Sequence, residues 1–252
     1  MTLDEKGLDF ETQDINLFKN EQYNPEYLKL NPKGVVPTLD HDGNIIIEST
    51  LICEYLDDTF PNPSLVPEDP FMRSQMRLWS KVVDEGIFEA TREITFASVF
   101  REKMKDMSPD QREKRYQNVG DLERRARYIS TYENGVESPY VLDGIAKFEK
   151  LFKNMETTLA DGRTWLLGDG YTLADISITP FIARLYYLTL LEVWLEERPR
   201  ATAWWEQAKS RPSYEVAIGH ALTEIQKFEM ETYGVKALET IRLRRDQYLG
   251  SY

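Results

Sequence analysis

The sequence predicts an α/β domain at the N-terminus, followed by a larger all-α domain. Two short apolar segments rich in β-branched residues flank an Asp-Gly pair at residues 42–43, and this pattern is typical of a β-hairpin. Four prolines then interrupt the chain between residues 61 and 70. Beyond residue 71 the apolar side chains recur at intervals of three and four residues, which predicts helices.

The first 30 residues precede the hairpin. Residues 1–8 are typical of the end of a helix that is closed by Gly7, because glycine readily adopts the left-handed conformation found there. Residues 9–15 alternate enough to predict a strand, with Phe10 and Ile15 as its apolar members. A polar connection and a short helix are expected over residues 16–30.

The first strand of the hairpin is expected to be entered through Pro37. Because proline cannot donate a hydrogen bond to a sheet, Pro37 must lie at a strand start, on an edge or at a bulge. The peptide bond before a proline can be cis at modest cost. The N–H and C=O of Val36 would then be free to pair with an extended peptide.

The helix after the hairpin is expected to begin at Ser49, which would cap it. Free amides and the helix dipole at that end suit a carboxylate, and the adjacent Glu48 suits an ammonium group. Backbone pairing together with one site for each charge predicts a small zwitterionic peptide as ligand.

Residues 31–39 have the sequence Asn-Pro-Lys-Gly-Val-Val-Pro-Thr-Leu, and Glu-Ser follows at 48–49. This order resembles the glutathione transferase superfamily, whose thioredoxin-like domain carries Asn-Pro-x-Gly-x-Val-Pro-x-Leu, a hairpin and Glu-Ser at a helix start. Taken singly, a proline before a strand and a serine at a helix start are ordinary features of folding. Their combination in this order is much harder to obtain by chance.

The resemblance implies a glutathione site. Val36 would pair with the cysteinyl unit of glutathione, and Pro37 would be cis. Glu48 and Ser49 would hold the γ-glutamyl end. Lys33 would face the glycyl carboxylate, at a position where the family varies.

In the family, the helix that corresponds to residues 1–7 is preceded by its own first turns and by a strand, and the loop between them carries the catalytic Ser, Tyr or Cys. The sequence starts partway into that helix. We therefore expect an N-terminally truncated chain whose thioredoxin-like domain lacks its first strand. The catalytic residue stays unknown.

The proline segment divides the predicted chain into three parts. Residues 1–62 would form the incomplete thioredoxin-like, glutathione-binding domain, residues 63–70 a Pro-rich linker, and residues 71–252 the all-helical C-terminal domain. A long helix is expected from Phe71 through Phe96. In the family the corresponding helix lines the second-substrate pocket, which makes Trp79 and Val83 candidates for it. The alternative is that both belong to the core between the domains.

Residues 101–129 mix charges of both signs, so they form either a basic binding patch or a solvated helical surface. This long insertion resembles the bacterial branch that contains β-aryl etherases and reductive dehalogenases of chlorinated hydroquinones. Later, Thr172 and Asp175 have the spacing of a capping box, a structural feature of the family's helical domain. An amphipathic helix with a charged tail is expected over residues 223–252.

The composition excludes several classes of partner. A net charge of −12 argues against a nucleic-acid partner and against an anionic membrane surface. The single cysteine, Cys53, excludes an internal disulfide and gives no zinc spacing, so no metal is predicted. We find no signal peptide and no long apolar run, which predicts a cytoplasmic protein.

The function predicted from the sequence is that of a glutathione transferase. Glutathione would be the co-substrate, and its thiolate would attack a small hydrophobic or aromatic electrophile, as in ether cleavage, dehalogenation or detoxification. A homodimer is expected from the family. The alternative is a non-catalytic binding or structural protein of the same fold that lacks the thiolate-stabilising residue.

Overall fold

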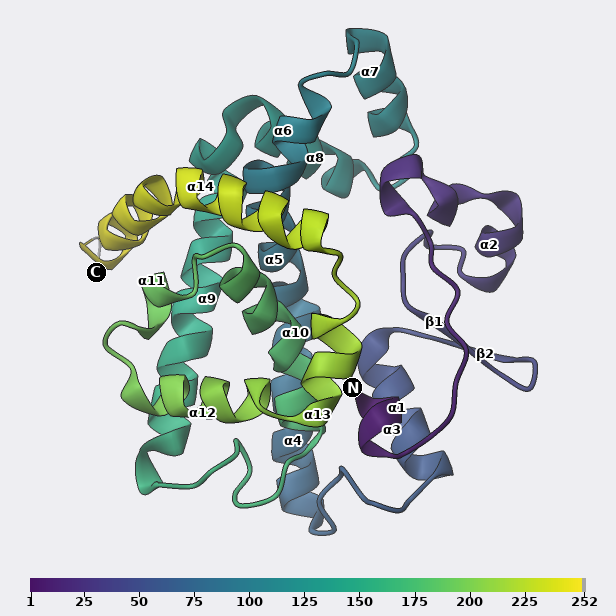
Figure 1. Ribbon diagram of the computed structural model, residues 1–252, viewed down its shortest axis with the longest axis vertical. Coiled ribbons are helices and arrows are strands. Elements are labelled where there is room, and N and C mark those ends of the chain that lie inside the picture. The colour runs from purple at the N-terminus through teal and green to yellow at the C-terminus, as the bar shows by residue number, and fades with distance from the viewer. Residues whose placement is uncertain (251–252) are drawn as a thin grey trace.

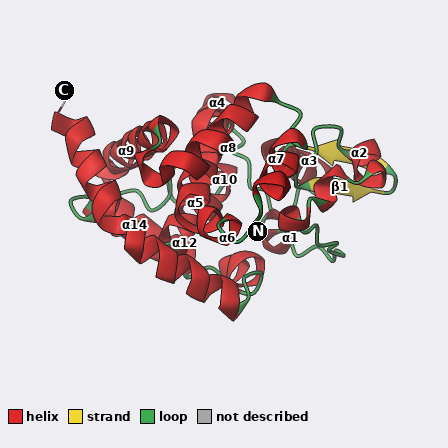
Figure 2. Cartoon of the chain, turned by 90° about the horizontal axis from the view of Figure 1, so that it is seen from above, coloured by secondary structure: helices red, strands yellow, loops and turns green. Residues whose placement is uncertain are grey.

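The structure is a computed structural model that describes residues 1–250, the side chain of Phe18 excepted. The last two residues of the predicted charged tail, 251–252, lie outside the described residues. A small α/β part lies beside a larger helical part, and Figure 2 shows the two strands grouped at one end of the molecule. The predicted fold class, a thioredoxin-like N-terminal domain followed by an all-α C-terminal domain, is confirmed.

The α/β part contains three α-helices and two strands in the described chain, with two short 3-10 turns, Leu17–Lys19 and Glu21–Tyr23, between α1 and α2. Their bounds are α1 Thr2–Glu5, α2 Pro25–Leu30, β1 Thr38–His41, β2 Asn44–Ile47 and α3 Ser49–Thr59.

The helical part follows the proline segment (Figure 1). Its helices are α4 Pro70–Val82, α5 Phe88–Thr95, α6 Arg101–Met104, α7 Pro109–Gln117, α8 Leu122–Asn134, α9 Pro139–Thr158, α10 Leu173–Tyr187, α11 Glu192–Leu195, α12 Pro199–Lys209, α13 Pro212–Tyr214 and α14 Glu224–Gly250. Two π-helical turns, Val83–Ile87 and Phe96–Phe100, join α4, α5 and α6. The helix predicted from Phe71 through Phe96 is present, but it is kinked at Gly86, where φ is 174° and ψ is −35°.

Strands β1 and β2 form the predicted antiparallel hairpin. Thr38 pairs with Ile47, and His41 pairs with Asn44 at the turn. Asp42 and Gly43 both have positive φ, at 53° and 84°, as the tight hairpin turn requires. The Asp-Gly pair therefore sets the register of the hairpin.

The strand predicted for residues 9–15 is wrong. These residues lie in neither a helix nor a strand, residues 9–14 are exposed, and Phe10 is 49% exposed. The sheet of the described chain consists of β1 and β2, and it offers residues 9–15 no partner. Alternation of polar and apolar residues creates a strand only where a neighbouring strand supplies hydrogen bonds, so the pattern alone was insufficient.

A buried cation ties the α/β part to the proline segment. The Lys6 ammonium forms an ion pair with Asp57 and donates to the carbonyl oxygens of Phe60 and Pro63, both at 2.7 Å. The other role of Asp57 is to accept from the Leu65 amide at 2.7 Å. Since buried charges are tolerated when paired and hydrogen-bonded, this cluster fixes the path by which the chain leaves α3.

The helical core contains the largest buried side chains. Phe148, Phe152 and Trp194 are fully buried and in ring contact with one another. Helix α14 crosses this core (Figure 1), and it passes very close to the end of α10. A Cβ placed on Gly234 of α14 would lie 1.8 Å from the Leu188 carbonyl oxygen. Glycine at this position is therefore required by the packing.

The predicted capping box at the start of α10 is present. The Asp175 carboxylate is fully buried and accepts four hydrogen bonds, from the Leu166 amide, the Thr172 amide and hydroxyl, and the Trp204 indole at 2.8 Å. Burial raises the pKa of Asp175, and these donors oppose the rise. The Asp175 carboxylate thus joins three segments in addition to capping the start of α10.

Candidate functional site

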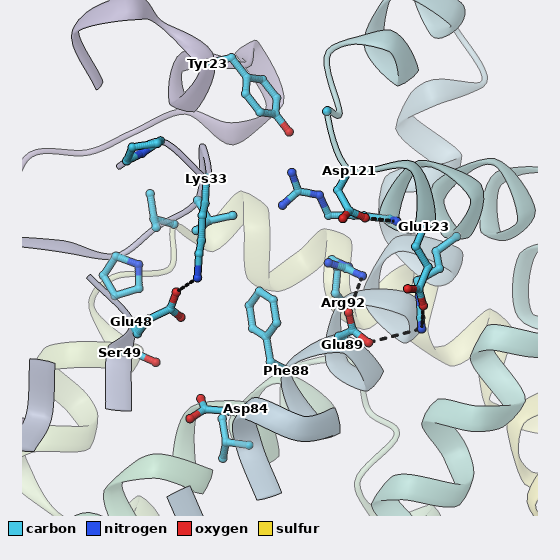
Figure 3. Close-up of a pocket in the computed structure, with 18 of the residues that line it drawn as sticks. Tyr23, Lys33, Glu48, Ser49, Asp84, Phe88, Glu89, Arg92, Asp121 and Glu123 are labelled. Carbon is cyan, nitrogen blue, oxygen red and sulfur yellow. Dashed lines mark hydrogen bonds and ion pairs between the residues drawn. The ribbon is translucent and has the colours of Figure 1, made fainter. Parts of the chain in front are cut away.

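A cleft of about 770 Å³ lies between the α/β part and the helical part. Figure 3 shows Lys33, Glu48 and Ser49 on one wall and Arg92 and Asp121 on the facing wall, with Phe88 between them. The cleft is lined by Tyr23, Leu28, Pro32, Lys33, Val35, Val36, Pro37, Glu48, Ser49, Val83, Asp84, Phe88, Glu89, Arg92, Asn118, Gly120, Asp121, Glu123, Arg124, Arg127 and Phe181.

The Val36–Pro37 peptide bond is cis, as the resemblance implied. Tyr27 and Asn31 hold the preceding residue, since both donate to the Val35 carbonyl oxygen, at 2.7 and 2.9 Å. Strand β1 begins after this segment, and within the described chain neither the N–H nor the C=O of Val36 has a hydrogen-bond partner. One peptide unit beside the cleft is therefore open to pairing.

The start of α3 differs from the prediction. Glu48, with φ 68° and ψ 116°, occupies the cap position, and Ser49 is the first helical residue. No side chain caps the helix, and its first backbone hydrogen bond runs from the Ile52 amide to the Glu48 oxygen at 2.8 Å. The amides ahead of Ile52 are therefore available to a ligand, and the unusual backbone of Glu48 is of a kind that often occurs at functional sites.

Two carboxylates flank this helix start. Glu48 forms an ion pair with Lys33, and both side chains are largely exposed. Asp84, from the π-helical turn, accepts from the Thr50 hydroxyl at 2.9 Å. Burial raises the pKa of Asp84, the Thr50 hydrogen bond opposes the rise, and the nearby Glu48 and Glu85 add to it.

The two candidates for the second-substrate pocket lie in different surroundings. Val83 lines the cleft although it is only 2% exposed. Trp79 is not among the residues that line the cleft in the described chain, and it packs against the main hydrophobic core. The structure therefore favours the core interpretation for Trp79.

The facing wall carries residues that the sequence reasoning did not select. Phe88 and Phe181 form an apolar surface, with perpendicular rings whose centroids lie 6.5 Å apart. Three arginines continue this wall, Arg92 from α5 and Arg124 and Arg127 from α8. The spacing of Arg124 and Arg127 places them on one helical face, but the sequence does not indicate which face meets the cleft.

Two of these arginines are neutralised by nearby carboxylates. Arg92 pairs with Glu93 at 3.0 Å and with Glu89 at 3.6 Å. Arg127 pairs with Glu123 at 2.7 Å and with Glu89 at 3.4 Å. Burial raises the pKa of Glu93, and Arg92 opposes the rise. Much of the positive charge on this wall is thus already compensated.

No group of three His, Cys, Asp or Glu side chains within residues 1–250 is arranged to hold a metal ion. No helix of the described chain is long and apolar enough to cross a membrane.

The fold agrees with comparisons to known proteins. Residues 1–64 match the family described as glutathione S-transferase, N-terminal domain, and residues 114–206 match glutathione S-transferase, C-terminal domain. The chain belongs to the glutathione S-transferase superfamily. It is 35% identical over 218 residues to protein LigF of Sphingobium sp., a match that covers 84% of each chain.

Solved structures and further relatives support the same branch. The crystal structure of beta-etherase LigF from Sphingobium sp. strain SYK-6 superposes with a TM-score of 0.76 at 33% identity, over 87% of this chain and 92% of that one. The tetrachloro-p-hydroquinone reductive dehalogenase of Sphingobium chlorophenolicum is 26% identical, over 86% of this chain and 88% of that one. The resemblance to the etherase and dehalogenase branch is confirmed.

Proposed function

We propose that the protein is a glutathione transferase whose cleft binds glutathione and presents its thiolate to an aromatic electrophile. The observation that carries this proposal is the open peptide unit of Val36 beside the uncapped start of α3. An extended peptide can pair with the first, and a carboxylate can bind at the second.

Each part of glutathione has a counterpart in the cleft. The cysteinyl unit pairs with the N–H and C=O of Val36, which Pro37 turns towards the ligand. The γ-glutamyl carboxylate binds the amide and hydroxyl of Ser49. The γ-glutamyl ammonium lies between Glu48 and Asp84.

Lys33 binds the glycyl carboxylate after it releases Glu48. An exposed ion pair contributes about 0–1 kcal/mol, so glutathione, which brings one group for each partner, can replace the Lys33–Glu48 pair at little cost.

The apolar wall of Val83, Phe88 and Phe181 receives the second substrate. The glutathione sulfur forms a bond to the electrophilic carbon, and the leaving group departs with the bonding electrons, as a phenoxide in ether cleavage or as a halide in dehalogenation. The catalytic residue is not assigned. The likeness to a beta-etherase and to a reductive dehalogenase supports these two reaction classes.

We further infer a glutathione-binding domain over residues 1–62, a linker over 63–70 and a substrate-binding helical domain over 71–252. We also infer a homodimer in the cytoplasm with a role in detoxification. Family membership supports these inferences.

Retention on immobilised glutathione and calorimetric titration with glutathione test the proposal. We expect Glu48→Ala and Ser49→Ala each to weaken binding about 10-fold, because hydrogen bonds to charged groups contribute roughly 1.5–3 kcal/mol. Glu26→Ala is the matched control, since this exposed carboxylate pairs with Lys29 outside the cleft. Unchanged retention in both cleft variants would remove the assignment. Retention without turnover of any electrophile would favour the non-catalytic alternative.

A further inference from the structure

All but one of the cationic side chains that line the cleft are paired with a carboxylate. Lys33 pairs with Glu48, and Arg92 and Arg127 pair with Glu89, Glu93 and Glu123. Two more carboxylates have protein donors, Asp84 from the Thr50 hydroxyl and Asp121 from the Arg124 amide at 2.6 Å.

Arg124 is the exception. Its backbone amide donates to the Asp121 carboxylate, which caps α8. Its guanidinium has no ion pair or hydrogen bond to any described side chain or backbone group. The Nε atom is shielded from solvent and unpaired. Leaving a buried N–H of a charged group unsatisfied costs free energy, and in this cleft a ligand can relieve that cost. A planar guanidinium suits a carboxylate, which it can bind through two parallel hydrogen bonds.

The wall of the cleft that carries Arg124 also carries aromatic rings. Phe88 is 44% exposed and lies in the cleft between the Glu48 wall and the Arg92 wall (Figure 3). Arg92 lies 5.8 Å from the centroid of the Phe88 ring and 5.6 Å from that of Tyr128. An arginine placed against rings in this way keeps an aromatic surface next to positive charge. The wall therefore combines a flat apolar area with a cationic end.

We propose that the second substrate is an acid-bearing aromatic compound whose carboxylate binds Arg124 while its ring lies against Phe88. This inference rests on the proposed function, which supplies the second-substrate role of the site. It narrows the substrate class from any hydrophobic electrophile to an amphipathic one. Neutral aromatic compounds of the same shape bind more weakly, because they leave the Arg124 guanidinium unpaired.

Two unreactive probes of the same shape test the proposal by calorimetric titration. The first is 3,5-dinitrobenzoate, which carries the carboxylate, and the second is its neutral amide, 3,5-dinitrobenzamide. S-methylglutathione is present throughout, because its blocked sulfur fills the co-substrate site without reacting. We expect the wild-type chain to bind the acid about 10- to 100-fold more tightly than the amide, the range for hydrogen bonds to a charged group.

The decisive variant is Arg124→Gln, which should abolish the preference for the acid and leave amide binding within about twofold. Arg124→Lys should keep part of the preference, because charge remains but the two-pronged geometry is lost. Lys114→Gln is the matched control, since it removes the same charge from an exposed position of α7 outside the cleft. It should behave as the wild type.

The possible failures are distinguishable. If S-methylglutathione binds but acid and amide bind equally, or if Arg124→Gln keeps the preference, the Arg124 site is overturned and the proposed function stands. If the acid is preferred but S-methylglutathione does not bind, the proposed function fails and Arg124 is a carboxylate site with no role in glutathione transfer. If neither is observed, both proposals fail.

Discussion

Lys33 and Glu48 form an ion pair on the wall of the cleft, although they are expected to serve opposite ends of glutathione. Both side chains are largely exposed, so the pair contributes little to folding. The pair instead keeps each charged group near the cleft while glutathione is absent. Under the proposed function, glutathione would exchange this one ion pair for two contacts with the ligand.

Lys33→Ala separates the contribution of this side chain to stability from its contribution to glutathione binding. We expect the free energy of unfolding to change by less than about 1 kcal/mol, because an exposed pair is lost. Affinity for glutathione should fall several-fold, whereas affinity for γ-glutamylcysteine, which lacks the glycyl carboxylate, should hardly change. Calorimetric titration of both peptides measures the difference, with Lys29→Ala as the control for an exposed lysine outside the cleft. Equal losses for the two peptides would contradict the role given to Lys33.

Asp84 should make glutathione binding depend on pH. Burial, with Glu48 and Glu85 nearby, raises the pKa of Asp84 above its ordinary 3.8. As pH falls from 7 through that raised pKa, the carboxylate is neutralised and its attraction for the ligand ammonium is lost. Affinity should therefore decline at a higher pH than an ordinary aspartate would cause, and Asp84→Asn should remove that part of the decline. Parallel pH profiles for the two proteins would contradict this role.

The Asp84 carboxylate should lower the stability of the folded state while it strengthens glutathione binding. The folded state holds the Asp84 proton more tightly than the unfolded state does, so the stability contributed by this group falls as pH rises through its folded pKa. Asp84→Asn should therefore unfold at a slightly higher denaturant concentration at pH 7 while binding glutathione less well. Chemical denaturation at pH 7 and at pH 4 checks the sign, since the gain should shrink at the lower pH.

Asp175 should matter far more to stability than its capping partner. Asp175→Ala leaves the Leu166 amide and the Trp204 indole unpaired in the core, so we expect a loss of about 3 kcal/mol or more in the free energy of unfolding. Thr172→Ala should cost about 1 kcal/mol. Urea denaturation of both variants compares them, and similar losses would mean that Asp175 acts as a helix cap alone.

Gly234→Ala should destabilise the protein although alanine is the better helix former. Propensity alone would favour the change by about 1 kcal/mol, but the new methyl group would lie 1.8 Å from the Leu188 carbonyl oxygen. We expect a net loss of about 2 kcal/mol or more, since overpacking forces the helix to move. Val235→Ala, at an exposed neighbouring position, should change little. Thermal unfolding of the two variants distinguishes these outcomes.

The sequence predicted best where local chemistry decides the structure. The hairpin follows from Asp42 and Gly43, the cis bond was expected from the motif around Pro37, and the box at Asp175 follows from its spacing to Thr172. The hairpin and the box involve residues near one another in the chain, so the rules of turns and caps were sufficient for them, whereas the cis bond was expected from the family resemblance.

The predictions that failed or were missed depended on distant partners or on an uncommon local backbone conformation. Residues 9–15 have strand-like alternation, but the described sheet gives them no partner. At the start of α3, the backbone conformation of Glu48 moves the cap one residue upstream of Ser49. Arg92 and Arg124 lie 32 positions apart in the sequence, and they share a wall only because α5 and α8 both border the cleft. A mixed-charge segment does not reveal which of its arginines is unpaired.

The π-helical turn at Val83–Ile87 lies between residues expected to bind glutathione and residues expected to bind the second substrate. It contains Asp84, and Phe88 follows it immediately. Such a wide turn accommodates an additional residue within a helix. Gly86 leaves the helical conformation within this turn, with φ 174° and ψ −35°, so the helix is kinked between Asp84 and Phe88. The direction in which Phe88 and Arg92 face the cleft is thus set by a bend inside the helical part, whereas Val36 and Glu48 are held by the hairpin segment.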